Sequence, residues 1–177
     1  MTGRAERVVL ALGSNLGDRA ETLAGAVRDI SALPGASLAA VSPTYESAAV
    51  KVDGVDDSAP RYLNSVLTLD YVGTPLELLE AVNAIEAAHG RVRAERWGDR
   101  TLDIDIIVFG NLELDDDRLT LPHPRAAERD FVLAPWLDLD EHAAVPGRGP
   151  VRNLLALAGN TMRRSVDVPE TEPGARS

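Results

Sequence analysis

The sequence contains no cysteine and only one lysine in 177 residues. Without cysteine there is no disulfide, no thiolate zinc site, no iron–sulfur cluster and no cysteine nucleophile. The lone lysine, Lys51, does not follow a run of glycines, which excludes a P-loop. Histidine is scarce as well, and His89, His123 and His142 are too far apart in the sequence to suggest a histidine metal cluster.

Long apolar runs and net positive charge are also missing. The longest early apolar run, residues 8–12, is too short for a signal-peptide core or a membrane span, so we expect a cytoplasmic protein without membrane contact. The formal net charge of −10 argues against binding nucleic acid through a basic surface. The chain length fits one globular domain, which we expect over residues 1–162, with the polar stretch 163–177 as a flexible tail.

Alternation between strand-like and helix-like apolar patterns predicts the fold class. Helices are predicted from the N-cap Asp18 to about residue 32 and from Pro75 to Gly90. Strands are predicted over residues 8–12, 37–47 with an interruption near Pro43, 62–72 and 101–109. We therefore expect an α/β (α+β) fold with a ferredoxin-like βαββαβ core and a mainly antiparallel sheet. Extra C-terminal elements near residues 125–139 and 151–158 would complete three α/β/α layers.

This topology brings several loops to one end of the sheet. The first two strands run parallel, and the third returns between them. Residues 13–18, 49–61 and 91–100 then meet the start of the last strand. Loops gathered on a rigid scaffold are where functional sites are usually built, so we expect the site at this end.

Two aspartates alternate with apolar residues in the last predicted strand. Asp103 and Asp105 share one face, about 7 Å apart along the chain. Two carboxylates among apolar neighbours are costly without a cation, and oxygen ligands without histidine or cysteine favour Mg²⁺. Such a pair is suited to holding two Mg²⁺ ions, as in phosphoryl and nucleotidyl transfer. The competing interpretation is an edge strand with one solvated polar face.

The loop before this strand, residues 91–100, carries four arginines and Trp97. The guanidinium fork suits phosphate oxygens, and Trp97 is placed to stack on a flat heterocycle. A solvated surface loop is the competing interpretation. Together with the aspartates, the loop indicates a Mg²⁺–polyphosphate site.

Two pairs of polar residues are weaker candidates. Asn83 and Glu86, three apart, share one face of the second predicted helix, where an ordinary helix surface is the alternative. Tyr62 and Asn64 point the same way at the start of the third strand. Asn64 either reads the edge of a planar heterocycle or is a strand-end asparagine.

These motifs together resemble the 6-hydroxymethyl-7,8-dihydropterin pyrophosphokinase family of folate biosynthesis. The resemblance is carried, in family order, by residues 11–18, 62–64, 90–93, 96–98, 100–106, 119–124 and 131–133. It implies a 2-amino-4-hydroxy-6-hydroxymethyldihydropteridine diphosphokinase, which transfers pyrophosphate from MgATP to the pterin hydroxymethyl group and releases AMP. The implied partners are ATP and the pterin, and the implied cofactor is Mg²⁺, as two ions.

The resemblance also implies a role for individual residues. Catalysis would rest on Arg91, Arg100, Asp103 and Asp105, the two aspartates also being the metal ligands. ATP would be bound by Glu86, Arg93, Ile106, Arg118, Thr120, His123 and Arg129. The pterin pocket would be formed by Ser47, Val50, Tyr62, Asn64, Trp97 and Phe131.

Two other functions use paired aspartates or this kind of fold. A two-metal nucleotidyl-transfer enzyme on a palm-like fold predicts nucleic acid or cyclic-nucleotide chemistry, but the net charge of −10 opposes nucleic acid and Trp97 has no role there. A non-catalytic small-molecule-binding regulatory module has no use for Asp103 and Asp105 beside four arginines. Because the fold alone does not separate these functions, the site decides in favour of the pyrophosphokinase, which we expect to be a monomer.

Overall fold

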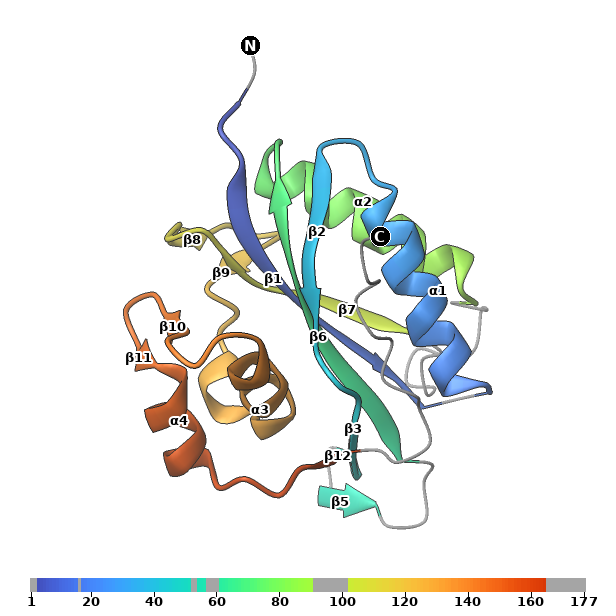
Figure 1. The fold of residues 1–177 in the computed structure, drawn as a ribbon, viewed down its shortest axis with the longest axis vertical. Helices are drawn as coiled ribbons and strands as arrows, with labels where there is room; N and C mark the ends of the chain where they lie inside the picture. Colours follow the sequence, from blue (N-terminus) through green and yellow to red (C-terminus); the bar gives the residue numbers. More distant parts are fainter. Residues whose placement is uncertain (1–2, 16, 52–53, 57–60, 91–101, 165–177) are drawn as a thin grey trace, which may run out of the picture.

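The computed structural model describes residues 3–15, 17–51, 54–56, 61–90 and 102–164, with the backbone alone for residues 49–51, 54–56 and 163. Within these residues, an antiparallel sheet forms the middle of the molecule (Figure 1). None of the helices in this part of the chain has both the length and the apolar composition needed to cross a membrane.

The sheet has the strand arrangement expected of a ferredoxin-like core. The central strand β1 (Glu6–Ser14) pairs antiparallel with β6 (Tyr62–Tyr71) on one side and with β7 (Asp103–Phe109) on the other. The strands β2 (Ala36–Val41) and β3 (Tyr45–Ser47) both pair antiparallel with β6, so β1 and β2 run parallel with β6 between them. In spatial order the strands are β12 (Arg163–Arg164), β3 (Tyr45–Ser47), β6 (Tyr62–Tyr71), β1 (Glu6–Ser14) and β7 (Asp103–Phe109), with β2 (Ala36–Val41) also on β6.

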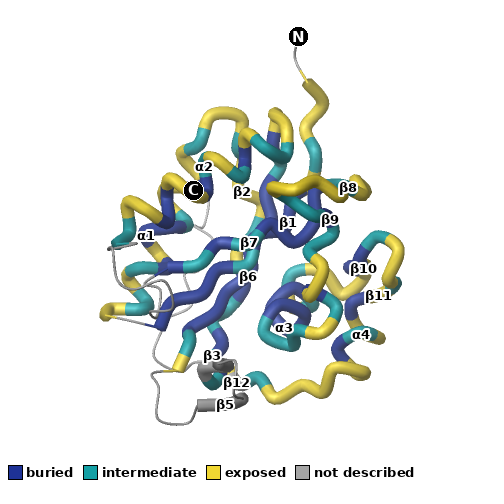
Figure 2. The backbone as a smooth tube through the Cα atoms, turned by 180° about the vertical axis from the view of Figure 1, so that it is seen from behind, coloured by how far each residue is buried: buried dark blue, intermediate teal, exposed yellow. Residues whose placement is uncertain are grey.

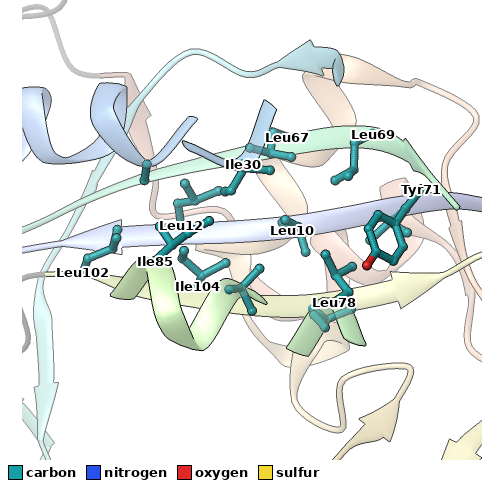
Figure 3. Packing of buried hydrophobic residues seen from close by; sticks show 14 of the residues in the cluster. Leu10, Leu12, Ile30, Leu67, Leu69, Tyr71, Leu78, Ile85, Leu102 and Ile104 are labelled. Atoms are coloured by element: carbon teal, nitrogen blue, oxygen red, sulfur yellow. The ribbon is translucent and has the colours of Figure 1, made fainter. Parts of the chain in front are cut away.

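Two capped helices, α1 (Arg19–Ser31) and α2 (Pro75–Ala88), cover one face of the sheet (Figure 1). Asp18 caps α1 by accepting a hydrogen bond from the Glu21 amide at 3.1 Å. Thr74 and Glu77 form a reciprocal capping box at the start of α2. The apolar sides of both helices meet the sheet in one buried cluster, part of which Figure 3 shows, with Leu10, Leu67 and Ile104 from the strands, Ile30 from α1 and Leu78 from α2.

The C-terminal third of the described chain covers the other face. The 3-10 turn η1 (Ala126–Glu128) leads into α3 (Asp130–Leu139), and α4 (Val151–Ala158) packs beside them. Leu133 and Trp136 of α3 pack in a second buried cluster with Val66 and Ile107 of the sheet. The strands β1, β6 and β7 are buried along most of their length between the two helical layers, as Figure 2 shows, whereas β2 is mostly exposed. The predicted fold class and its three layers are confirmed.

In the described ranges, three short hairpins accompany the sheet and its two helical layers, and two segments differ from the expectation. The hairpins are β4 (Ala49–Lys51) with β5 (Gly54–Asp56), β8 (Leu114–Asp115) with β9 (Thr120–Leu121), and β10 (Ala144–Val145) with β11 (Gly149–Pro150). The segment 49–61, expected as a loop, therefore contains a hairpin. The expected tail begins with β12, which pairs with β3, so the folded chain extends at least to Arg164.

Candidate active site

Polar side chains form a row across the end of the sheet where β1 finishes. In register, Gly13 of β1 lies between Asn64 of β6 and Asp103 of β7, and Ala11 lies opposite Asp105. The small residues on β1 leave space between these side chains. A Cβ atom on Gly13 would lie 3.3 Å from Asn64 Oδ1, which is a tight contact. Glycine at this position of β1 therefore leaves room for the Asn64 side chain of β6.

The two aspartates lie on one face of β7, as the alternation predicts. Ile104 and Ile106 point into the core under α1 and α2, whereas Asp103 and Asp105 line a cavity on the α3 side. Both are partly buried, and the Asp105 side chain is 44% exposed. β7 is an edge strand, but its carboxylates face a cavity rather than an open solvated surface.

This cavity, which we call the Asn64 cavity, has a volume of about 480 Å³. It contains both aspartates and four of the residues implied for the pterin pocket, namely Ser47, Tyr62, Asn64 and Phe131. Asn64 is only 5% exposed, and its Nδ2 donates to Ser47 Oγ at 2.7 Å. The same Nδ2 also donates to the Tyr45 carbonyl at 3.4 Å, and because a carbonyl only accepts, this contact assigns the amide orientation and leaves Oδ1, an acceptor, on the side of Gly13.

Arg129 links the aspartates to the aromatic wall of the Asn64 cavity. Its Nη1 lies 3.6 Å from Asp105 Oδ2, and its Cζ lies 5.5 Å from the centre of the Phe131 ring. Burial lowers the pKa of Arg129, and the Asp105 carboxylate opposes that change. Because guanidinium groups stay protonated in proteins, Arg129 places a fixed positive charge beside Asp105.

A second cavity of about 330 Å³, the Glu86 cavity, forms around the outer edge of β7. No further strand covers this edge in the described sheet, so its backbone groups bond elsewhere. The Ile104 amide donates to Glu86 Oε1 at 2.7 Å, and the Ile107 carbonyl accepts from the His123 amide at 2.8 Å. These bonds hold α2 and the segment around His123 against the strand.

The Glu86 cavity collects five residues that the family resemblance implies for ATP: Glu86, Ile106, Arg118, Thr120 and His123. Glu86 is 5% exposed, so its interpretation as ordinary helix surface is wrong. Asn83 also lines the cavity. Asp105 lines both cavities and therefore lies on the wall between them.

The electrostatic environment of His123 favours the neutral imidazole. Burial lowers the pKa of His123, and Arg129 and Arg125 lower it further, while Asp105 opposes them. Its Nδ1 accepts a hydrogen bond from the Arg125 amide at 3.2 Å. In the neutral ring this acceptor role assigns the proton to Nε2, which can donate to an oxygen.

Some of the predicted residues lie outside the part of the chain that the structure describes. These are Arg91, Arg93, Trp97 and Arg100, together with the side chain of Val50. Their roles remain predictions.

Several residues lining the Asn64 cavity were not singled out from the sequence, among them Arg125, Glu128, Thr161 and Met162. Arg125 follows His123 by two residues and precedes Arg129 by four, and this close spacing of basic residues is the sequence signal that points to Arg125. Thr161 and Met162 reach the cavity because Arg163–Arg164 pairs with β3. A two-residue strand leaves no recognisable apolar pattern.

The aspartate pair fits a magnesium ion bound together with a phosphate ligand. Within the described ranges, no group of three or more histidine, aspartate or glutamate side chains is placed to hold a metal ion. Mg²⁺ commonly binds through one or two carboxylates and completes its shell with substrate phosphates and water. The carboxylates of Asp103 and Asp105, partly exposed in one cavity, meet that requirement.

Comparison with known proteins identifies the family. Residues 9–141 match the model of the 7,8-dihydro-6-hydroxymethylpterin-pyrophosphokinase (HPPK) family. The 2-amino-4-hydroxy-6-hydroxymethyldihydropteridine pyrophosphokinase of Pseudomonas aeruginosa is 44% identical over 151 residues, which cover 85% of this chain and 91% of that protein. The protein of the same name from Mycobacterium tuberculosis is 40% identical over 173 residues, covering 90% of this chain and 88% of that protein.

A solved structure shares the fold. The crystal structure of Plasmodium falciparum HPPK-DHPS A437G with SDX-DHP matches with a TM-score of 0.67 and 14% identity, covering 92% of this chain. This chain spans 49% of the length of that solved chain, so the likeness concerns one part of it. The family model and the relatives confirm the resemblance found in the sequence motifs. The chain belongs to the 7,8-dihydro-6-hydroxymethylpterin-pyrophosphokinase family.

Proposed function

We propose that this protein transfers pyrophosphate from ATP to the hydroxymethyl group of 6-hydroxymethyl-7,8-dihydropterin, giving the pterin diphosphate and AMP in folate biosynthesis. The observation that carries this proposal is the position of Asp105 on the wall shared by two cavities. A transfer between two substrates requires a donor pocket and an acceptor pocket that meet at the reacting atoms.

The Glu86 cavity is the proposed ATP side. Arg118 and the Nε2–H of His123 supply donors for phosphate oxygens, and Ile106, whose side chain packs in the core, is assigned to the nucleotide because it lines the same cavity. Glu86 accepts a hydrogen bond from the Ile104 amide, which holds its carboxylate in the cavity, and we assign this carboxylate to a hydroxyl or amino group of the nucleotide. We assign Thr120 and Arg129 to the same substrate, and Arg93 by position in the sequence.

The Asn64 cavity is the proposed pterin side. Tyr62 and Phe131 offer aromatic surfaces for a flat ring, and Trp97 is assigned to the same ring by sequence position. The buried Asn64 Oδ1 is an acceptor for the N–H edge of the pterin, and the bonds from Nδ2 to the Tyr45 carbonyl and to Ser47 Oγ hold the amide in this orientation. Val50 is assigned to this pocket by sequence position alone.

In the reaction, the pterin hydroxyl oxygen forms a bond to the β-phosphorus of ATP and loses its proton. The bond from the β-phosphorus to the oxygen shared with the α-phosphate breaks, and AMP leaves with that oxygen. Asp103 and Asp105 would hold Mg²⁺, as two ions, which neutralises the phosphate oxygens and polarises the phosphorus when bound. Arg129, and by sequence position Arg91 and Arg100, stabilise the charge on the transferred group, so the protein acts by positioning and electrostatics.

The experiment is incubation of the purified protein with ATP, Mg²⁺ and the pterin, with the nucleotide products separated. We expect AMP in an amount equal to the pterin diphosphate, and none without pterin. Formation of ADP, or nucleotide turnover that ignores the pterin, would contradict the proposal. Release of inorganic pyrophosphate with a nucleotidylated product would instead favour the palm-like nucleotidyl transferase. Binding of both substrates without turnover would favour the non-catalytic module.

The proposal also includes a cytoplasmic location and a monomeric state. Light scattering during size-exclusion chromatography tests the second point. A mass near the 18.9 kDa of one chain is expected.

A further inference from the structure

The reaction proposed above moves a highly charged group from one cavity to the other. Before transfer, the two terminal phosphates belong to ATP on the Glu86 side. After transfer, they are attached to the pterin in the Asn64 cavity, on a chain whose net charge is −10. The acceptor side therefore needs positive charge of its own besides any metal.

Arg125 supplies such a charge. Arg125 lines the Asn64 cavity together with Asp103, Asp105 and Arg129, and it is not among the residues of the Glu86 cavity. It stands at the start of η1, where its amide donates to His123 Nδ1. Arg125 therefore belongs to the acceptor cavity, whose wall at Asp105 is where transfer is proposed to occur.

The charge of Arg125 is only weakly engaged in the absence of substrate. In the described part of the chain, the only carboxylate within 4.0 Å of its guanidinium is that of Glu128, with Nε and Oε2 4.0 Å apart. The two side chains are 67% and 72% exposed. Arg129, by contrast, is 24% exposed and is held between Asp105 and Phe131. Arg129 belongs to the fixed wall, whereas Arg125 is available to an incoming anion.

The electrostatic effect of Arg125 reaches the same centre. It contributes to lowering the pKa of both His123 and Arg129, although burial is the larger cause for each residue. The charge of Arg125 therefore acts within the same group of residues as His123 and Arg129.

We propose that Arg125 binds the transferred diphosphate on the acceptor side, which makes it a binding residue for the pterin diphosphate. The inference rests on the proposed function and extends it to a residue outside the implied ATP and pterin sets. The diphosphate displaces Glu128 from Arg125, so Glu128 is a competitor of the product. Arg125 and Glu128 together then set how tightly the diphosphate is retained relative to the unmodified pterin.

The test compares equilibrium binding of two ligands, the pterin and its diphosphate, by calorimetry at a fixed Mg²⁺ concentration. For Arg125→Gln we expect about three- to tenfold weaker binding of the diphosphate, because a partly screened charge-assisted contact is lost. Binding of the unmodified pterin should stay within about twofold, since it carries no phosphate for the guanidinium to bind. For Glu128→Gln we expect about two- to threefold tighter binding of the diphosphate.

The matched control is Arg152→Gln, which makes the same change in net charge. Arg152 is exposed on α4, lines neither cavity and donates to the Glu141 carbonyl. The proposal is overturned if Arg125→Gln leaves diphosphate binding unchanged, weakens both ligands equally, or behaves as Arg152→Gln does. Because the readout is binding, it is independent of the AMP assay. If the protein makes no AMP but Arg125→Gln still weakens binding of the diphosphate selectively, the proposed function is overturned and the proposed role of Arg125 in diphosphate binding is retained.

Discussion

The Glu86 cavity and the Asn64 cavity share Asp105 but are built in different ways. The Glu86 cavity is built on the edge of β7, where backbone hydrogen bonds to Glu86 and His123 attach neighbouring segments to the strand. The Asn64 cavity is built on the face of the sheet, where Ala11 and Gly13 open space between longer side chains. The Glu86 cavity is therefore shaped by the unpaired edge of a strand, and the Asn64 cavity is shaped by the small size of Ala11 and Gly13.

This difference has a functional consequence for the proposed enzyme. Polar groups in the Asn64 cavity are held in place by side-chain hydrogen bonds, such as that between Asn64 and Ser47. Groups held in this way are suited to binding one rigid ring selectively. The Glu86 cavity has more exposed polar groups, including Arg118 in an ion pair with Glu80 at 3.1 Å. We therefore expect substitutions in the two cavities to affect the two substrates separately, and only substitutions at the shared wall to affect both.

The largest expected effect is at the shared wall. Asp105→Ala should lower kcat about a thousandfold or more, because it removes a proposed metal ligand and one charge beside Arg129. The side chain is nearly half exposed, so the melting temperature should change little. Steady-state AMP formation and thermal unfolding provide the two readouts. Asp103→Ala should behave similarly.

The matched control for the aspartates is Asp70→Ala. Asp70 forms an exposed ion pair with Arg7, toward the opposite end of β1 and β6, and should leave kcat unchanged. A near-normal rate for Asp105→Ala at saturating Mg²⁺ would refute the role of the shared wall, and with it the comparison between donor and acceptor cavities.

The next effect is confined to the Asn64 cavity. Asn64→Ala should raise the KM for the pterin about ten- to a hundredfold, because the ring edge loses a buried hydrogen-bond partner. The Kd for ATP, measured without pterin, should change less than about twofold. Ser47→Ala keeps Asn64 and its contact with the Tyr45 carbonyl but removes one partner of the amide, so its effect on the pterin should be smaller. Equal losses for ATP and pterin would mean that the cavities are not independent.

A smaller effect is expected from the Glu86 cavity. Glu86→Gln retains an oxygen for the Ile104 amide and so preserves the fold, but it removes the charge. The Kd for ATP should rise about five- to tenfold while pterin binding stays unchanged. Glu21→Gln, at an exposed ion pair on α1, is the control for loss of a carboxylate. An altered pterin affinity with normal ATP binding would reverse the proposed assignment of the two cavities.

The sequence predicted the central strands and helices well because their signals are local. Asp18 and the Thr74 capping box mark helix starts, and alternation places Asp103 and Asp105 on one face. Arg125 and Met162 could not be placed in the same way. Their position depends on the turn after His123 and on the pairing of β12 with β3, which bring together residues far apart in the chain. Glu86 was ambiguous because its burial depends on the unpaired edge of β7, a tertiary feature.

The smallest effect is expected at Tyr45, whose hydrogen bonds hold the strand next to Asn64 in place. Tyr45 lies opposite Asn64 in the β3–β6 register, and its hydroxyl bonds with Asp138 of α3 and with Arg164 of β12. Tyr45→Phe should lower the free energy of unfolding by about 1 kcal/mol, the usual contribution of such a bond. The KM for the pterin should rise by no more than about twofold, since Asn64 keeps its bond to Ser47.

The stability difference between wild type and Tyr45→Phe should depend on pH. Burial, and next the bond to Asp138, raise the pKa of Tyr45 above its ordinary value of 10.0, while Arg164 opposes them. The native state therefore holds this proton more tightly than the unfolded chain, so the stabilisation is complete below pH 10 and is lost as pH rises through the raised pKa. Wild type should lose its stability advantage over Tyr45→Phe in that alkaline range, as measured by denaturant unfolding at several pH values. Equal stability of wild type and Tyr45→Phe at every pH would show that Tyr45 supports the cavity wall through the packing of its ring alone.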